Sequence, residues 1–202
     1  MKVQTDPKIN KAIIISAPSG AGKTSIVKQL LAALPELEFS ISACSRPKRE
    51  NETDGKDYYF LTAEEFRRRI EAGEFAEWQE VYPGNYYGTL RSELERIRKH
   101  NRIPLFDLDV IGGLNLKKFF GDAALAAFIA PPSLKELENR LRNRNTESEE
   151  SLNTRIAKME YEMGFAGKFD LVIVNDDLEK SVSDAIERVR QFIDSAAALP
   201  QR

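Results

Sequence analysis

The segment from Ala17 to Thr24, Ala-Pro-Ser-Gly-Ala-Gly-Lys-Thr, constrains the fold of this chain more than any other. It directly follows the apolar, β-branched run 12–16 and precedes the helix-like segment 26–31. Glycines let the backbone curl until successive N–H groups point at phosphate oxygens, and a helix that begins there adds its positive N-terminal end. A strand, such a loop and a helix are typical of a P-loop, which predicts a nucleoside triphosphate site.

Individual residues of this loop are expected to have separate roles. Lys23 reaches the β- and γ-phosphates of the nucleotide, and Thr24 offers its hydroxyl to Mg²⁺. The strict pattern begins with glycine where this chain has Ala17, so a negative φ is needed there. The alternative, a glycine-rich turn that binds nothing, is disfavoured because Gly-Lys-Thr opens a helix. The expected ATP-binding residues are Ala17, Pro18, Ser19, Gly20, Ala21, Gly22, Lys23 and Thr24.

Short apolar runs alternate with amphipathic stretches, which predicts an α/β fold with a mostly parallel sheet covered by helices. Between the second and third runs the pattern changes to a polar loop, alternating aromatic residues and a helix, which indicates an inserted α+β lobe. Thr62 with Glu65, and Ser133 with Glu136, have the spacing of a helix capping box. The predicted strands are residues 12–16, 39–43, 103–109, 125–130 and 171–175.

The composition disfavours several classes of protein. The 30 Lys and Arg residues and 32 Asp and Glu residues give a net charge of −2, so the chain is not a polycation that binds nucleic acid or anionic membrane. No apolar stretch approaches the about 18 residues of a membrane span, and the N-terminus lacks a signal peptide's apolar run. Lone Cys44 cannot form an internal disulfide. We therefore expect a soluble, cytoplasmic protein.

Eight ordered motifs resemble the guanylate kinase family, whose members pass a phosphoryl group from ATP to GMP. They are the phosphate loop and residues 42–49, 55–58, 77–78, 84–89, 107–109, 131–133 and 174–177. The resemblance covers nearly the whole chain and implies a P-loop kinase fold, with a five-stranded parallel sheet flanked by helices, an inserted GMP-binding lobe and a small lid. The implied division is 1–41 and 98–202 for the core, with the lid at about 140–155, and 42–97 for the lobe.

The polar residues of the inserted segment suit a nucleoside monophosphate. Arg46 and Arg49, three apart in a polar loop, can each form two hydrogen bonds to phosphate oxygens. Tyr58 and Tyr87 can add hydroxyl donors. Taken singly, such arginines are more simply solvated surface charges and such tyrosines half-buried strand residues, so the interpretation depends on their occurring together.

Guanine presents an N1–H and an exocyclic amine side by side, and one carboxylate can accept both. The resemblance implies that Glu77 and Asp109 meet the base and that Ser42 and Thr89 supply hydroxyls around it. Adenine would leave the buried carboxylate without partners, which costs affinity. The alternative for Glu77 is a surface charge at a strand edge.

Asp107 and Asp109 follow the apolar run 103–106, so we expect them at the C-terminal end of a strand, where open α/β sheets bind ligands. The resemblance implies that Asp107 lies near Mg²⁺, through water. The chain departs from the family at Ile111, where a Gln is usual.

The resemblance also implies that Arg144 and Arg155 close on the transferred phosphoryl group. Positive charge around the equatorial oxygens is what such a transfer requires. Asn143 and Asn145 stand where glycines are common in the family, so we expect altered closing kinetics of the lid rather than lost chemistry.

The sequence is compatible with three functions. The first is a Mg²⁺-dependent enzyme whose partners are ATP and GMP, or dGMP, without an obligate protein partner. The second is a non-catalytic binding module of the same fold, disfavoured because Lys23, Thr24 and both lid arginines are kept. The third is a P-loop kinase with another small acceptor. Cys44 and His100 have no expected role, and Trp78 is expected in the core.

Overall fold

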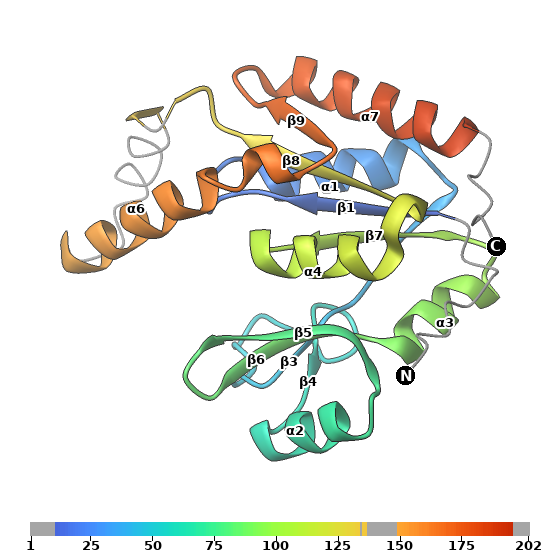
Figure 1. Ribbon diagram of the computed structural model, residues 1–202, viewed down its shortest axis with the longest axis vertical. Coiled ribbons are helices and arrows are strands. Elements are labelled where there is room, and N and C mark those ends of the chain that lie inside the picture. The colour runs from blue at the N-terminus through green and yellow to red at the C-terminus, as the bar shows by residue number, and fades with distance from the viewer. Residues whose placement is uncertain (1–10, 134, 137–148, 196–202) are drawn as a thin grey trace.

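The computed structural model describes residues 11–133, 135–136 and 149–195, with the backbone alone for 149–155. Five parallel strands form one sheet in the order β2-β7-β1-β8-β9 (Figure 1). Their bounds are β1 (Ala12–Ser16), β2 (Leu37–Phe39), β7 (Ile103–Leu108), β8 (Ala124–Ala130) and β9 (Leu171–Val174). The predicted α/β fold with a five-stranded parallel sheet is confirmed.

Helices cover both faces of this sheet (Figure 1). Ile13 and Ile15 of β1 pack on one face with α1 (Lys23–Ala33) and α7 (Leu178–Asp194). Ile14 points to the other face, where α4 (Val110–Phe120) and α3 (Arg91–Lys99) supply the core. Because successive side chains of a strand point to opposite faces, the run of buried isoleucines serves two cores at once.

The second predicted strand, 39–43, is wrong. β2 ends at Phe39, and the N–H of Ser40 donates the last hydrogen bond to the carbonyl oxygen of Leu105, at 2.9 Å. The chain then leaves the parallel sheet, and β3 (Ala43–Cys44) joins another sheet. Both β3 residues are fully buried, so apolar residues occur on both sides of the point where the chain leaves the parallel sheet. Cys44 is a buried free thiol.

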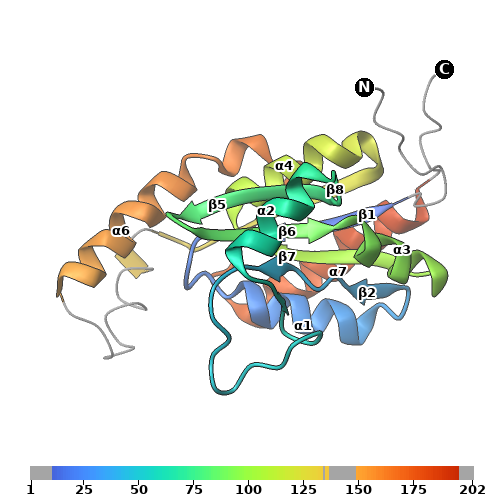
Figure 2. The same ribbon diagram turned by 90° about the horizontal axis from the view of Figure 1, so that it is seen from below.

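The second sheet has the order β4-β3-β6-β5 and lies on the far side of α4 from the parallel sheet (Figure 1). α2 covers its outer face, seen from below in Figure 2, and Phe66 of α2 stacks on Phe75 at 4.3 Å between ring centroids. The bounds are β4 (Tyr59–Phe60), α2 (Ala63–Glu71), β5 (Phe75–Tyr82) and β6 (Asn85–Leu90). α4 packs against β5 and so joins the two sheets.

The predicted helix caps are present. The hydroxyls of Thr62 and Ser133 accept hydrogen bonds from the backbone N–H groups of Glu65 and Glu136, at 3.0 and 3.1 Å. The Glu65 carboxylate bonds to arginines of its own helix. α6 (Glu149–Met163) and the short helices η1 (Gly121–Ala123) and η2 (Ala166–Lys168) complete the described elements.

The expectation that Trp78 lies in the core is wrong. Trp78 is 42% exposed, whereas its neighbour Glu77 is only 7% exposed. The pairing of β5 with β6 shifts register between Phe75 and Glu77, so Phe75 packs with α2 whereas Glu77 pairs with Thr89 and points to the opposite face, toward α4. The ring of Trp78 lies on the same face as Phe75, near Tyr86 at 6.4 Å between centroids, but at the exposed part of that face.

The parallel strands place several loops at one edge of the sheet. The phosphate loop follows β1, Asp109 follows β7 and Asn175 follows β9. Since carboxyl ends of parallel strands meet at the same edge, these residues come together although they lie far apart in the sequence. Within the described part of the chain, no helix is long and apolar enough to cross a membrane.

Candidate active site

The phosphate loop connects the end of β1 to the start of α1. Both of its glycines have positive φ values, 91° at Gly20 and 93° at Gly22, a backbone conformation that residues with a side chain rarely adopt. The N–H of Ala21 donates to the carbonyl oxygen of Pro18 at 3.2 Å and closes the turn. The φ of Ala17 is not positive, so its methyl group is accommodated as the sequence requires. The loop lines a cavity of about 420 Å³, here named the loop cavity.

Asn175, which follows β9, holds the backbone of this loop in place. It is 5% exposed, and its side-chain Nδ2 donates a hydrogen bond of 2.7 Å to the carbonyl oxygen of Ala21. A Cβ atom added at Gly22 would lie 2.2 Å from the same nitrogen. The loop is therefore fixed both by its own backbone conformation and by a side chain from the end of β9.

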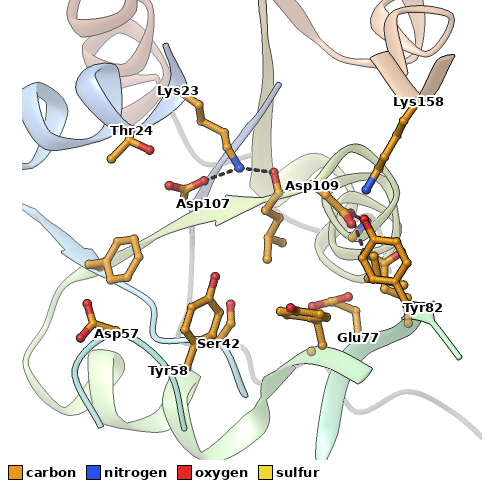
Figure 3. Close-up of a pocket in the computed structure, with 17 residues that line it drawn as sticks. Lys23, Thr24, Ser42, Asp57, Tyr58, Glu77, Tyr82, Asp107, Asp109 and Lys158 are labelled. Atoms are coloured by element: carbon orange, nitrogen blue, oxygen red, sulfur yellow. Dashed lines mark hydrogen bonds and ion pairs between the residues drawn. The ribbon is translucent and has the colours of Figure 1, made fainter. Parts of the chain in front are cut away.

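Lys23 begins α1, and its ammonium group crosses to the end of β7. Nζ forms an ion pair with Oδ1 of Asp107 and donates a hydrogen bond of 2.7 Å to the carbonyl oxygen of Leu108 (Figure 3). Thr24 and Asp107 both line the cavity of about 430 Å³ described below. Oxygen donors of this kind suit Mg²⁺, which takes few protein ligands when a nucleotide supplies the rest. The residues present therefore fit a magnesium ion, with Lys23 holding Asp107 beforehand.

A second cavity, of about 430 Å³, is lined by residues of both sheets and is here named the sheet cavity (Figure 3). Five of the residues expected to contact GMP line it, and Thr89 lies fully buried behind Glu77. The five are Ser42, Tyr58, Glu77, Tyr87 and Asp109. Burial raises the pKa of Tyr58, so its hydroxyl stays protonated at neutral pH and can donate.

Glu77 brings a buried carboxylate to the wall of the sheet cavity. Oε1 accepts a hydrogen bond of 2.9 Å from Oγ1 of Thr89, on the neighbouring strand β6. Burial raises the pKa of Glu77 to about 7, and the charge of Asp109 acts in the same direction, against the bond from Thr89. The carboxylate is thus poorly compensated by the protein and would be stabilised by a ligand that donates to it.

Asp109 caps the N-terminus of α4 and faces both cavities. Its Oδ1 accepts hydrogen bonds from the N–H of Gly112 at 2.8 Å and from Nε2 of Gln79 at 2.6 Å. Gln79 comes from β5, two residues after Glu77. One amide therefore joins the second sheet to the end of β7 beside the candidate base site.

Arg46 and Arg49, the two predicted phosphate-binding arginines, are not among the described residues that line either cavity. The guanidinium of Arg46 forms two hydrogen bonds with Glu52, at 2.6 and 2.7 Å, and lies 5.0 Å from the ring centroid of Tyr58. Arg46 holds the pKa of Glu52 down at about 2. The backbone N–H of Arg49 also donates to Glu52, at 2.9 Å. Glu52 thus holds the loop that carries Arg46 and Arg49 beside Tyr58, and Tyr58 lines the sheet cavity.

Comparisons with known proteins agree with this geometry. A model of the family described as guanylate kinase matches residues 9–195. The chain belongs to the guanylate kinase family. It is 52% identical over 183 residues to the guanylate kinase of Salinibacter ruber, covering 91% of this chain and 97% of that protein. It is also 52% identical over 186 residues to the guanylate kinase of Porphyromonas gingivalis, covering 92% and 99%.

The crystal structure of guanylate kinase from Anaplasma phagocytophilum has a similar fold. Its TM-score is 0.74 at 28% sequence identity, and the match covers 94% of this chain and 89% of that one. The resemblance that the sequence indicated is therefore confirmed. Guanylate kinases are ATP:GMP phosphotransferases, so the chain is assigned to the nucleotide-binding transferases.

The lid of this guanylate kinase is predicted at about 140–155, which overlaps the segment 137–148 outside the described residues. Arg144, Asn143 and Asn145 lie outside the described residues. Arg155 belongs to α6, and its side chain also lies outside them.

Several residues at the site received no individual role from the sequence, although Asp57 and Asn175 lie in motifs that carry the family resemblance. They are Asp57, Gln79, Lys158, Glu162 and Asn175, each of which lines a cavity or contacts the phosphate loop. Gln79 shares the two-residue period of β5 with Glu77, which is a usable local signal. Lys158 and Glu162 give no local signal, because the packing of α6 over the loop is a long-range property of the guanylate kinase fold.

Proposed function

We propose that this site transfers the γ-phosphoryl group of ATP to GMP, giving ADP and GDP, with Mg²⁺ as cofactor. The observation that carries the proposal is the junction of the two cavities. Lys23 and Thr24, at the end of the phosphate loop, line both the loop cavity and the sheet cavity that holds Glu77. A triphosphate bound in the loop would therefore point its last phosphate at a ligand in the sheet cavity.

The donor side of the reaction rests on the phosphate loop. Its inward N–H groups and the start of α1 bind the phosphates of ATP, and Lys23 exchanges Asp107 for a phosphate oxygen. Thr24 and Asp107, the latter through water, would hold Mg²⁺, which supplies positive charge to the phosphate oxygens when bound. The ion pair of Lys23 with Asp107 keeps both groups at the cavity junction before the nucleotide arrives.

The acceptor side rests on Glu77. Its carboxylate is suited to accept hydrogen bonds from N1–H and the exocyclic amine of guanine, and Asp109, Ser42 and Thr89 surround the same base. A base without these donors would leave a buried carboxylate unpaired, which disfavours AMP. In the proposed complex, Arg46, Arg49, Tyr58 and Tyr87 hold the phosphate of GMP or dGMP.

The chemical step needs alignment more than covalent help. An anionic oxygen of the GMP phosphate attacks the γ-phosphorus of ATP, and the bond from that phosphorus to the bridging oxygen of the β-phosphate breaks. The electron pair of that bond remains on ADP, and no Ser, Cys or His nucleophile takes part. Lys23, and Arg144 and Arg155 from the proposed lid at about 140–155, neutralise charge on the transferred group.

The proposal includes a division of labour within the chain. Residues 42–97 form the acceptor lobe, and residues 1–41 and 98–202 form the core. The second sheet, which runs from β3 to β6, and the position of Glu77 in it support this division. We also propose a cytoplasmic location, which the buried free thiol of Cys44 suits.

The test is ADP formation from ATP with GMP, AMP, CMP and UMP in parallel, each with and without Mg²⁺. The proposal predicts Mg²⁺-dependent turnover with GMP and little with the other acceptors. Equal turnover with AMP would contradict the guanine site. Binding of GMP without any turnover would contradict the catalytic role and favour a binding module.

A further inference from the structure

Lys158 lies where the two cavities meet. Four residues line both the loop cavity and the sheet cavity, namely Lys23, Thr24, Asp109 and Lys158. The first three already have proposed roles with the phosphates, the metal or the base. Lys158 comes from α6 and enters the sheet cavity from the side opposite to Lys23 (Figure 3).

The ammonium group of Lys158 is held loosely by its described neighbours. Nζ lies 5.4 Å from the ring centroid of Tyr82, at the end of β5, and 3.8 Å from Oε1 of Glu162, one turn further along α6. The side chain is 42% exposed. An ammonium group has three donors, and neither neighbour is within the about 3 Å of a charge-assisted hydrogen bond. Lys158 can therefore form new bonds to a ligand without breaking strong ones.

Glu162 connects this lysine to the phosphate loop. It is 6% exposed and lines the loop cavity. Burial raises the pKa of Glu162, while Lys158 and a backbone hydrogen bond from Ser19 act against the increase. A buried carboxylate that touches the loop thus holds Lys158 on the loop side, and the ring of Tyr82 holds it on the side of the second sheet.

Charge explains why a cation is useful at this point. Among the described residues that line the cavities, the carboxyl groups are Asp57, Glu77, Asp107, Asp109 and Glu162, and the cations are Lys23 and Lys158. Two nucleotides would bring several more negative charges to the same junction. A positively charged donor that is already in place stabilises the phosphate oxygens there without having to move during the reaction. Preorganised charge assists phosphoryl transfer in this way.

We propose that Lys158 binds the phosphate groups at the junction of donor and acceptor, opposite Lys23. This inference rests on the proposed function, since it concerns the same pair of nucleotides. Tyr82 and Glu162 act as positioning residues that hold the ammonium group near this point. Lys158 then serves the complex of both nucleotides more than either nucleotide alone, because the junction is filled only when both are bound.

The test compares Lys158→Met, which keeps the length of the side chain but removes the charge, with Lys158→Arg. Lys168→Met is a matched control, because Nζ of Lys168 also lies over a ring, 4.6 Å from the centroid of Phe165, and Lys168 lines neither cavity. Calorimetry measures the affinity for GMP and for a probe in which adenosine and guanosine are joined by five phosphates. Steady-state kinetics and thermal melting are measured on the same proteins.

The proposal predicts that Lys158→Met weakens binding of the joined probe by about tenfold or more, and lowers kcat similarly, with less than about threefold change for GMP alone. Lys158→Arg should recover most of the loss, and Lys168→Met should behave as the wild type. The melting temperature should be equal in all four proteins.

Two results would overturn the inference. If the probe and GMP are weakened equally, Lys158 acts by holding α6 to the end of β5. If Lys158→Met matches Lys168→Met, the lysine has no role at the junction. Failure of the proposed function is distinguishable from both, because the wild-type protein itself would then fail to bind the joined probe. If Lys158→Met has a lowered melting temperature, the affinities for the joined probe and for GMP are compared between Lys158→Arg and the wild type instead. Equal weakening of both ligands in Lys158→Arg would overturn the inference.

Discussion

The hydroxyl of Thr89 donates a hydrogen bond of 2.9 Å to Oε1 of Glu77 across β6 and β5, and both residues are buried. Together with a backbone hydrogen bond from Thr89, this bond compensates only in part for the burial of a carboxylate that is 7% exposed, and the pKa of Glu77 rises to about 7. The arrangement costs stability in the free protein. It is useful if a ligand later donates to the same carboxylate, because binding then recovers part of that cost.

The first prediction concerns stability and pH. The pKa of Glu77 is raised from its ordinary value of 4.5 to about 7 in the folded protein, so between pH 4.5 and 7 the folded protein binds more protons than the unfolded chain. Its free energy of unfolding should therefore fall as pH rises from about 5 to 8. Glu77→Gln removes this titration and should be more stable than the wild type at pH 8 by about 3 kcal/mol at most.

Urea unfolding followed by circular dichroism at pH 5, 6.5 and 8 measures this difference. Glu71→Gln, an exposed carboxyl of α2, is the control and should parallel the wild type. If Glu77→Gln also keeps a constant difference from the wild type across this range, the raised pKa is refuted.

The second prediction concerns Lys23. Replacing Lys23 by alanine removes the ammonium group at the cavity junction, and we expect kcat to fall about 100-fold or more. The affinity for GMP should stay within about twofold, because Glu77 and the other residues proposed to contact GMP are unchanged. Lys28→Ala changes an exposed lysine of the same helix and should leave both values unchanged. Normal turnover of Lys23→Ala would remove the assigned role of the phosphate loop.

The third prediction concerns Gln79, whose amide donates to Asp109 at 2.6 Å. Gln79→Leu keeps the bulk but frees the Asp109 carboxylate, so the KM for GMP should rise about tenfold with little change in the KM for ATP. Gln191→Leu removes an exposed amide that donates to Glu187 at 3.0 Å and serves as the matched control. Equal changes in the two KM values would show that Gln79 supports the fold in general.

The fourth prediction concerns Gly22. Its φ of 93° and the nearby amide of Asn175 leave no room for a side chain. Gly22→Ala should lower the free energy of unfolding by about 1–2 kcal/mol from the φ value alone, and should weaken ATP binding because the loop must move. Gly167→Ala introduces the same methyl group into open space and should have little effect. Thermal melting and ATP titration of both variants provide the measurement.

Local patterns predicted what depends on local structure. The strand, loop and helix around Lys23 follow from glycines and an apolar run, and Thr62 caps α2 because a hydroxyl three residues before Glu65 can reach its N–H. The apolar run 39–43 was misassigned because β2 and β3 are buried in different sheets, and composition does not show which core an apolar residue enters.

Residues whose partners lie far along the chain were harder to predict. From hydrophobicity alone, Trp78 is expected to be buried and Glu77 to be exposed. The register of β5 with β6 instead leaves Trp78 exposed and buries Glu77. Asn175 and Lys158 reach the site only because β9 and α6 end beside the phosphate loop. Such contacts depend on topology, which a single sequence specifies only through the whole fold.

The central claim is that the sheet cavity around Glu77 binds GMP while the loop cavity binds ATP. The most direct measurement is calorimetric titration of GMP, and separately of a non-hydrolysable ATP analogue, into the wild type and Glu77→Ala. The account predicts that the variant loses at least about tenfold in affinity for GMP and less than about twofold for the ATP analogue. Equal losses for both ligands, or an unchanged affinity for GMP, would contradict it.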